Sequence, residues 1–324
     1  MELVDTLDLG SSAIRRQSSS LCRGTLFMSQ KPIEENSKNT ENEKGVIEVL
    51  VHSFFVIPFI IVVFGVLFFF MWKMLSDESD SAYDYLNEIK IGAATKRWQS
   101  AFELAKILGN PDLVPTDEKF VNELTMVYRN SIHDDPQVRT YLALAMGATR
   151  NSEYGEVLLE GLKDQNIQSK VSSIKSLGQI KYGKAIPLLL PLIKKNITDD
   201  IRLSAIMAIG MISDTSTVKD LLPLLDDEEA NIRWESAVAL AKLKNSRAVP
   251  VIKELLQRDY LKKFPQVDEW EQVQAILVAI HVSGILKSDE FIPHLEKLAL
   301  HDLNMKVRDS AIKTLKKVYN KDVG

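Results

Sequence analysis

The sequence is defined first by what it does not contain. A single cysteine, Cys22, excludes a disulfide within one chain. The 40 basic residues do not outnumber the 44 acidic ones, which argues against sequence-independent binding of nucleic acid. There is no Gly-rich phosphate loop and no G-x-S-x-G motif, and no two histidines are four residues apart. We therefore expect no catalytic residue, bound metal, cofactor or small-molecule substrate.

One long hydrophobic run stands out. The 24 residues from Val49 to Trp72 carry no formal charge. A helix of this length rises roughly 36 Å, which suffices to cross a hydrocarbon core of about 30 Å. A buried core helix is usually shorter, and a cleaved signal peptide lies nearer the N-terminus. The run predicts a single transmembrane helix over residues 49–73, with Trp72 and Lys73 at the membrane interface.

The segments beside this helix are polar. Residues 1–48 are rich in Ser, Glu, Asn and Lys, so we expect a disordered tail, in which Met28 is an alternative start of translation. Residues 74–82 are predicted to be a linker. The positive-inside rule leans slightly toward an extracytoplasmic domain, because three lysines lie on the tail side of the helix: Lys31, Lys38 and Lys44. Membrane sidedness stays open at this point.

The remainder of the chain repeats itself. Small residues follow apolar stretches at intervals of 31, 32, 31 and 43 residues: Gly147, Gly178, Gly210, Ala241 and Gly284. Apolar residues recur at helical spacing before each of them. Nine residues later a proline opens a second apolar stretch in three copies: Pro187, Pro250 and Pro293. Proline suits the first turn of a helix, and a small residue near a helix end permits a left-handed cap. The pattern predicts helix pairs that share one core by stacking.

The best copy, from Ile201-Arg202 to Gly210, resembles the V-R-x-x-A-x-x-A-L-G motif of short HEAT-like repeats of the phycobilisome-lyase type. The resemblance covers residues 135–319. It implies an all-α fold, a HEAT-like α-solenoid of stacked antiparallel helix pairs, which in this family usually binds another protein. We expect these repeats over residues 134–324 and an N-terminal helical cap over residues 83–133. HEAT-like di-iron hydroxylases carry His-Glu pairs, and no histidine here is followed by glutamate.

Basic residues recur at one position of the repeat: Arg139, Lys170, Arg202, Arg233 and Arg308. A ladder of this kind could recognise an acidic partner. We favour a structural role, in which each arginine pairs with an acidic residue of its own or the next repeat, such as Asp135, Asp199 or Glu229, because arginine makes strong bidentate pairs.

An insertion of about 12 residues interrupts the repeat over roughly residues 257–272, between Ala241 and Gly284. Insertions in solenoids usually emerge as loops on one face, often the binding face. Trp98 lies in an amphipathic pattern and is expected in the core. Trp234 stands where other copies vary, so we expect it to be partly exposed. The predicted partner-binding residues are Trp234, Tyr260, Phe264 and Trp270.

These features together predict a membrane-anchored scaffold that binds or organises partner proteins and is not an enzyme. Its membrane contact is the helix over residues 49–73, and its partners are unknown proteins, not nucleic acid. One alternative is a non-catalytic subunit of a larger membrane complex. Another is a HEAT-like enzyme of the lyase or hydroxylase type, which needs a bound chromophore or metal.

Overall fold

The computed structural model describes residues 52–76 and 81–323, and every regular element in these ranges is a helix. The chain divides into two units, Met1–Ser76 and Asp77–Gly324. The predicted tail over residues 1–48, with Cys22 and Met28, lies outside the described residues, and so do residues 77–80 of the predicted linker. The linker bounds of 74–82 are wrong at both ends, because the helix before it continues to Ser76 and the next helix begins at Ala82.

The first unit contains the predicted apolar helix. A π-helical turn, His52–Val56, leads directly into the α-helix α2, Ile57–Ser76. The stretch Phe54–Trp72 has a mean hydropathy of 3.0, and none of it is buried. Within the described ranges it is the one helix long and apolar enough to cross a membrane, judged by length and composition. An apolar helix over residues 52–73 of the predicted range is confirmed, and it extends to Ser76, while residues 49–51 lie outside the described residues. That this helix spans a membrane stays a prediction.

The second unit begins with the segment predicted to be a cap. It forms α3 (Ala82–Ile91), α4 (Ala94–Ile107) and α5 (Glu118–Asn130). Helix α4 packs along α6 (Pro136–Ala148) much as α6 packs along the next repeat. Trp98 on α4 packs against the core, as predicted. The cap is therefore an additional helix pair in the same stack, preceded by α3.

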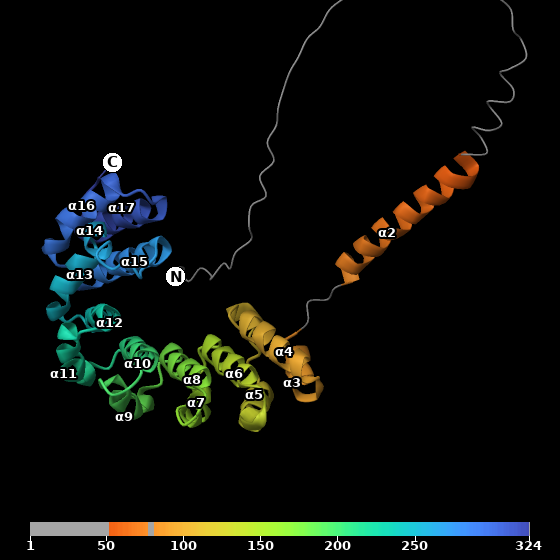
Figure 1. Cartoon of the computed structure of the whole chain (residues 1–324), viewed down its shortest axis with the longest axis horizontal. Helices are drawn as coiled ribbons and strands as arrows, with labels where there is room; N and C mark the ends of the chain where they lie inside the picture. The colour runs from red at the N-terminus through yellow and green to blue at the C-terminus, as the bar shows by residue number, and fades with distance from the viewer. Residues whose placement is uncertain (1–51, 77–80, 324) are drawn as a thin grey trace, which may run out of the picture. The chain divides into compact units, whose positions relative to one another are not determined.

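The repeats follow as antiparallel helix pairs that share one hydrophobic core. The first helices of the pairs are α6, α8 (Ile167–Gln179), α10 (Asp199–Ile212), α12 (Ala230–Lys242), α15 (Glu269–Leu286) and α17 (Met305–Tyr319). The second helices are α7 (Gly155–Gly161), α9 (Ile186–Leu189), α11 (Val218–Leu221), α13 (Val249–Leu255) and α16 (Ile292–His301). Within this unit the first helices line the inner side of the row and the second helices its outer side (Figure 1).

The repeated glycines do not cap helices, so that expectation is wrong. Gly178 lies inside α8, and a Cβ added there would stand 2.7 Å from the Cα of Ala208 on the next first helix. At Gly210 an added Cβ would stand 2.8 Å from the Cβ of Ala239. The small residue thus allows neighbouring first helices to approach closely. The left-handed residues lie three positions later and are not glycine: Arg150, Lys181, Ser213, Lys244, Lys287 and Asn320.

The prolines behave as predicted and add a second feature. Pro187, Pro250 and Pro293 each lie in the first turn of a second helix. Two further prolines, Pro191 and Pro223, lie where α9 and α11 tighten into the 3-10 helices η6 (Leu190–Ile193) and η8 (Leu222–Asp226). Proline has no N–H for the carbonyl four residues before it, so the α-helical pattern cannot continue through it.

Two of the five ladder residues, Arg139 and Arg202, form ion pairs as the structural interpretation predicts, but mostly with other partners than expected. Arg202 Nη2 donates to Asp227 Oδ2 at 2.5 Å and Nη1 to the expected Asp199 at 3.1 Å. Arg139 Nε donates to Asp164 Oδ2 at 2.6 Å. Asp135, the expected partner of Arg139, instead accepts the N–H of Gln137 at the start of α6.

The other arginines of the ladder bind backbone. Arg233 Nη1 donates to the carbonyl oxygens of Asp227 and Glu228, at 2.7 and 2.9 Å, and not to the predicted Glu229 side chain. Arg308 Nη1 makes the equivalent bonds to Asp302 and Leu303. These arginines hold the turn that precedes their own helix, so their charge is used within the fold.

Candidate protein-interaction surface

Three of the four predicted contact residues form one aromatic cluster. The ring of Trp234 lies edge-on to Phe264, with centroids 4.9 Å apart, and Phe264 lies 5.3 Å from Tyr260. Trp234 Nε1 donates to the hydroxyl of Tyr260 at 3.2 Å. Trp234 is only 8% exposed, so the expectation that it is partly exposed is wrong. Tyr260 and Phe264 are half-buried.

The insertion explains this burial. It forms the short helix α14 (Arg258–Leu261), whose Leu261 is fully buried, and then a turn that ends where Asp268 and Glu271 cap α15. Helices α12 and α15 pack less extensively than the first helices that precede them in the row, and the aromatic rings fill the space beside α12. The insertion therefore contributes side chains to the core beside α12. Whether its residues also contact a partner remains a prediction.

Trp270 differs from the other three. It lies in the first turn of α15 and is 62% exposed. Its indole has no packing role that would account for a large apolar side chain at this position. Large aromatic residues of this kind are frequent energetic centres of protein interfaces. Of the predicted contact residues, Trp270 is the most exposed.

Further exposed apolar residues lie on the edge that Trp270 shares. We call this the connecting edge, meaning the turns in which each second helix ends and the next first helix begins, with the first turn of that helix. Because all helix pairs are antiparallel, these turns lie on one side of the stack. Its exposed apolar residues are Ile132, Ile167, Trp270, Leu303 and Met305. Sequence reasoning missed all but Trp270, although Leu303 lies in a polar turn, Asp302 to Asn304.

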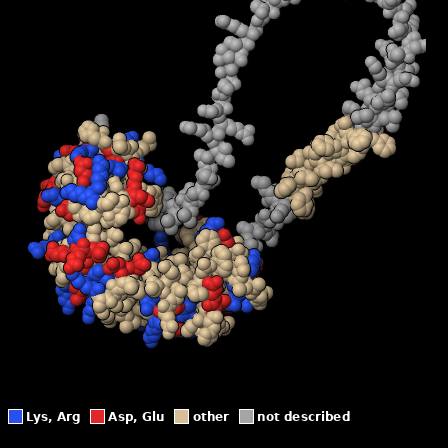
Figure 2. Space-filling view, viewed as in Figure 1, with Lys and Arg blue, Asp and Glu red and all other residues tan. Residues whose placement is uncertain are grey.

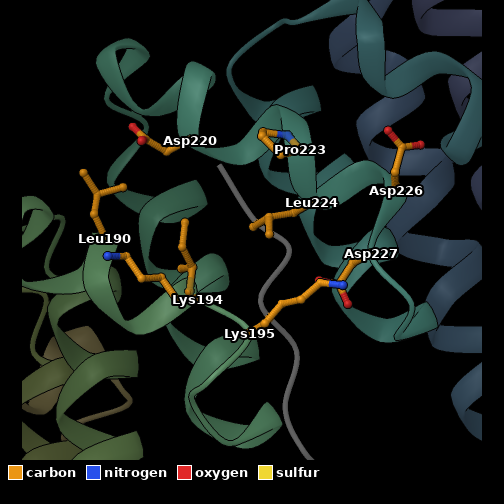
Figure 3. Close-up of a pocket in the computed structure, with 9 residues that line it drawn as sticks. Leu190, Lys194, Lys195, Asp220, Pro223, Leu224, Asp226 and Asp227 are labelled. Atoms are coloured by element: carbon orange, nitrogen blue, oxygen red, sulfur yellow. The ribbon is translucent and has the colours of Figure 1, made fainter.

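A recess opens between two second helices beside the connecting edge. It measures about 430 Å³ and lies between η6 and η8. Figure 3 shows Lys194 and Lys195 at the end of η6 and Asp226 and Asp227 at the end of η8. Its apolar lining residues are Leu190, Ile193, Pro223 and Leu224. The recess exists because both second helices tighten at a proline and end in a pair of like charges.

The charges of the recess largely cancel one another. Burial alone would raise the pKa of Asp227, but the hydrogen bond from Arg202 and the N–H of Glu229 hold that pKa below its ordinary value. Asp227 is therefore ionised and already paired. Lys195 Nζ lies 3.0 Å from Glu228 Oε1. Carboxylates also gather over this part of the surface between α11 and α13 (Figure 2). A recess so neutralised and open gives no arrangement for acid–base chemistry.

Two half-buried carboxyl groups in this part of the fold have no hydrogen-bond or ion-pair partner among the described residues: Asp220 in the recess and Glu235 on α12. Glu235 on α12 is half-buried and makes no hydrogen bond or ion pair there. Burial raises the pKa of Glu235 to about 7, and the charge of Lys242 only partly opposes this. The group contrasts with Asp164, Asp227 and Asp302, each of which accepts an arginine.

Metal ligands do not converge in the described part of the chain, where no group of three or more His, Cys, Asp or Glu side chains could hold an ion. His281 lies on α15, while His294 and His301 lie on α16. Burial lowers the pKa of His294, with the charges of Lys253 and Lys297 acting in the same direction.

Comparison with known proteins identifies the repeat. The family model for HEAT repeats matches residues 121–209 and 192–262. This part of the chain is therefore similar to HEAT repeats, in agreement with the stacked helix pairs of the fold. The match begins inside α5, which agrees with the observation that the predicted cap stacks as a further helix pair. The sequence matches none of the curated proteins.

One solved structure has a similar fold at a TM-score above 0.5, and two others align with lower scores. The complex of CpcE and CpcF of phycocyanin lyase from Nostoc sp. PCC7120 aligns with a TM-score of 0.55 at 15% identity, over 74% of this chain and 88% of that one. YibA from Escherichia coli aligns with a TM-score of 0.43 at 19% identity, over 75% and 84%. A designed armadillo repeat protein in complex with the peptide (KR)4 aligns with a TM-score of 0.40 at 16% identity, over 74% and 99%. At these identities the likeness concerns the fold alone.

Proposed function

We propose that this protein is a membrane-anchored scaffold that holds partner proteins beside a membrane and has no catalytic activity of its own. The observation that carries the proposal is the combination of two surfaces. One is the helix Phe54–Trp72, which is apolar over its whole length and unburied. The other is the connecting edge of the HEAT repeats, where Trp270 and Leu303 are 62% and 86% exposed.

Each surface favours a different contact. A helix with no buried residue and large exposed side chains, such as Phe55 at 73%, is stable in lipid and costly in water. On the connecting edge the strongest contact residue is Trp270, because tryptophans are frequent energetic centres of protein interfaces. A membrane helix restricts the repeats to the membrane surface and raises their effective concentration toward partners there.

The membrane half of the proposal has a direct test. Full-length protein and a variant lacking residues 54–72 are compared in membrane fractions washed with alkaline carbonate. We expect the full chain to resist extraction and the deletion variant to appear in the supernatant. A full chain that is released by carbonate would contradict membrane anchoring, whatever the repeats bind.

A second candidate function is a chromophore-lyase activity, favoured by the fold likeness to the phycocyanin lyase complex. An enzyme of that type must hold a chromophore. Purified protein incubated with a linear tetrapyrrole would then show a stable shift of its absorption spectrum. We expect no such shift, and its observation would favour the lyase.

A further inference from the structure

The two edges of the stack differ in charge. We call the edge opposite the connecting edge the return edge, meaning the turns in which each first helix from α6 onward ends and its second helix begins: residues 149–154, 180–185, 213–217, 243–248 and 287–291. Its basic residues are Arg150, Lys181, Lys184, Lys244, Arg247 and Lys287, and they outnumber its acidic residues, which are Glu153, Asp214, Asp289 and Glu290. By contrast, the connecting turns before α6 and α12 contain acidic residues and neither lysine nor arginine.

Most of the left-handed positions on the return edge are occupied by cations. Four residues there have φ between 53° and 57°: Arg150, Lys181, Lys244 and Lys287. A cation near the C-terminus of a helix is favourable in any helix, but glycine or asparagine fits a left-handed backbone with less strain. All four cations are exposed, and their side chains make no hydrogen bond or ion pair with the described residues. Their charge is therefore available to a partner, unlike that of Arg139 and Arg202 in the ladder.

The chain enters the second unit at this same edge. The return turn of the first pair, residues 108–117, leads into α5. At the start of α3, Tyr83 donates from its hydroxyl to Asp117 Oδ1 at 2.5 Å, and its ring lies 5.2 Å from that of Phe120. The first turn of α3 thus lies beside the first turn of α5. Residues 77–81 alone separate α2 from α3, and five extended residues span at most about 18 Å.

We propose that the return edge binds the headgroups of anionic phospholipids in the membrane that holds α2. This inference rests on the proposed scaffold function and gives the repeats an orientation. A headgroup phosphate supplies the negative charge that the exposed cations lack, and each lysine or arginine near an anionic surface adds to the attraction. The entry of the chain at this edge favours lipid over an acidic protein, because lipid lies within reach of every anchored copy. The connecting edge, with Trp270, then faces away from the membrane.

Lipid contact can be measured in nanodiscs that contain the full-length protein. In a Cys22→Ser background, a fluorophore is attached through Ser246→Cys on the return edge or Asn196→Cys on the connecting edge, both at exposed positions. The discs carry a nitroxide headgroup quencher in phosphatidylcholine alone or mixed with phosphatidylglycerol. We expect quenching of the label at residue 246 in the anionic discs, its loss at high salt, and no quenching of the label at residue 196.

A matched pair of triple variants tests the role of charge. Lys181→Gln, Lys244→Gln and Lys287→Gln together should weaken docking of the return edge, by about fivefold for each cation removed. The control removes the same charge from the connecting edge through Lys163→Gln, Lys194→Gln and Lys195→Gln, and should leave the quenching unchanged. The melting temperature of each triple variant shows that a loss of quenching is not a loss of folding.

The outcomes separate this inference from the scaffold function. Equal quenching at both edges, quenching in phosphatidylcholine alone, or quenching unaffected by the return-edge variant overturns the inference. If lipid quenching is absent and the return-edge variant instead loses crosslinks to an acidic protein in native membranes, the scaffold function stands and the inference falls. If the full chain does not insert into the discs, both fall.

Discussion

Arg202 on α10 and Asp227, 25 residues later, form an ion pair in which the two side chains are each 3% exposed. The second oxygen of Asp227 accepts the N–H of Glu229 at 3.0 Å, so the carboxylate also shapes the turn that begins the next repeat. Asp164 repeats this arrangement with Arg139 and the N–H of Asn166, and Asp302 with Arg258 and the N–H of Asn304. The pair thus links one repeat to the next.

Removing the carboxylate of Asp227 should destabilise the fold. We expect Asp227→Ala to lower the free energy of unfolding by about 3–5 kcal/mol, because Arg202 would keep a buried charge without its main partner. Thermal unfolding of the full chain in detergent measures this. Asp226→Ala is the matched control, since Asp226 is exposed, and should change stability by less than about 0.5 kcal/mol. Equal effects of the two substitutions would contradict the assigned role.

The same pairs predict behaviour in acid. The pKa values of Asp227 and Asp302 are lowered in the fold: burial opposes the lowering, and the hydrogen bonds from Arg202 and Arg258 outweigh it. Their contribution to stability is full above the unfolded pKa of about 3.9 and is lost as pH falls through the lower folded values. We expect the difference in melting temperature between Asp227→Ala and the native chain to begin shrinking near pH 4 and to vanish only below the lowered pKa of the folded state.

The contribution of Glu235 to stability should change with pH in the opposite direction. Its pKa is raised by burial to about 7, above the unfolded value of about 4.3, so the folded state holds the proton across this window and stability falls as pH rises through it. Glu235→Gln should therefore melt close to the native chain at pH 5. At pH 8 it should melt higher by roughly 2–4 °C, the equivalent of about 1 kcal/mol.

The exposed Glu229→Gln controls for the change in net charge and should show no such pH dependence. A Glu235→Gln variant that melts at the native temperature at both pH values would show that the carboxyl group is not desolvated.

Because neighbouring first helices are in close contact, adding one methyl group between them should destabilise the fold. Gly178→Ala places its Cβ 2.7 Å from the Cα of Ala208, so α8 and α10 must separate, and we expect a loss of about 1–3 kcal/mol in thermal unfolding. Gly183→Ala is the control, because no atom lies within 4 Å of its added Cβ. A loss of the same size at both positions would attribute the effect to something other than helix packing.

Two aromatic substitutions distinguish packing from contact. Phe264→Ala removes a ring held 4.9 Å from Trp234 and should destabilise the protein by about 2–3 kcal/mol. Trp270→Ala removes an exposed side chain and should change stability by less than about 0.5 kcal/mol. Under the scaffold proposal, Trp270→Ala weakens partner binding in crosslinked membranes while the melting temperature stays constant. Unchanged partner binding would remove Trp270 from the interface.

The fold could be predicted from sequence because its signals are periodic. Apolar spacing, the prolines of the second helices and the basic ladder each recur, so each copy supports the others. The glycines were placed correctly but interpreted wrongly: a residue without Cβ suits both a left-handed cap and a close helix contact. Only the position of Ala208 opposite Gly178 distinguishes the two roles. That is a contact between residues 30 positions apart, which the local sequence does not show.

The candidate surface could be predicted only in part. The residue type at the repeat position of Trp234 differs between copies, as is typical of an exposed position. Trp234 is nevertheless buried, because the insertion carries Tyr260 and Phe264 onto it. No repeat pattern contains that information, since the insertion occurs once. Glu235 was missed because a single carboxylate in a chain that is 26% charged gives no signal. Its isolation depends on the absence of a donor nearby.

The aromatic insertion has a mechanical consequence. At the junctions before it, glycines bring successive first helices into backbone contact, whereas the junction of α12 with α15 depends on rings from the inserted segment. Rings can slide and tilt at lower cost than interlocked backbones. The junction of α15 with α17 also lacks a close glycine contact, since a Cβ added at Gly284 would stand 3.5 Å from Val318. A load carried along the stack would therefore deform the two junctions of α15 first, and compliance would be concentrated toward the C-terminal end of the row.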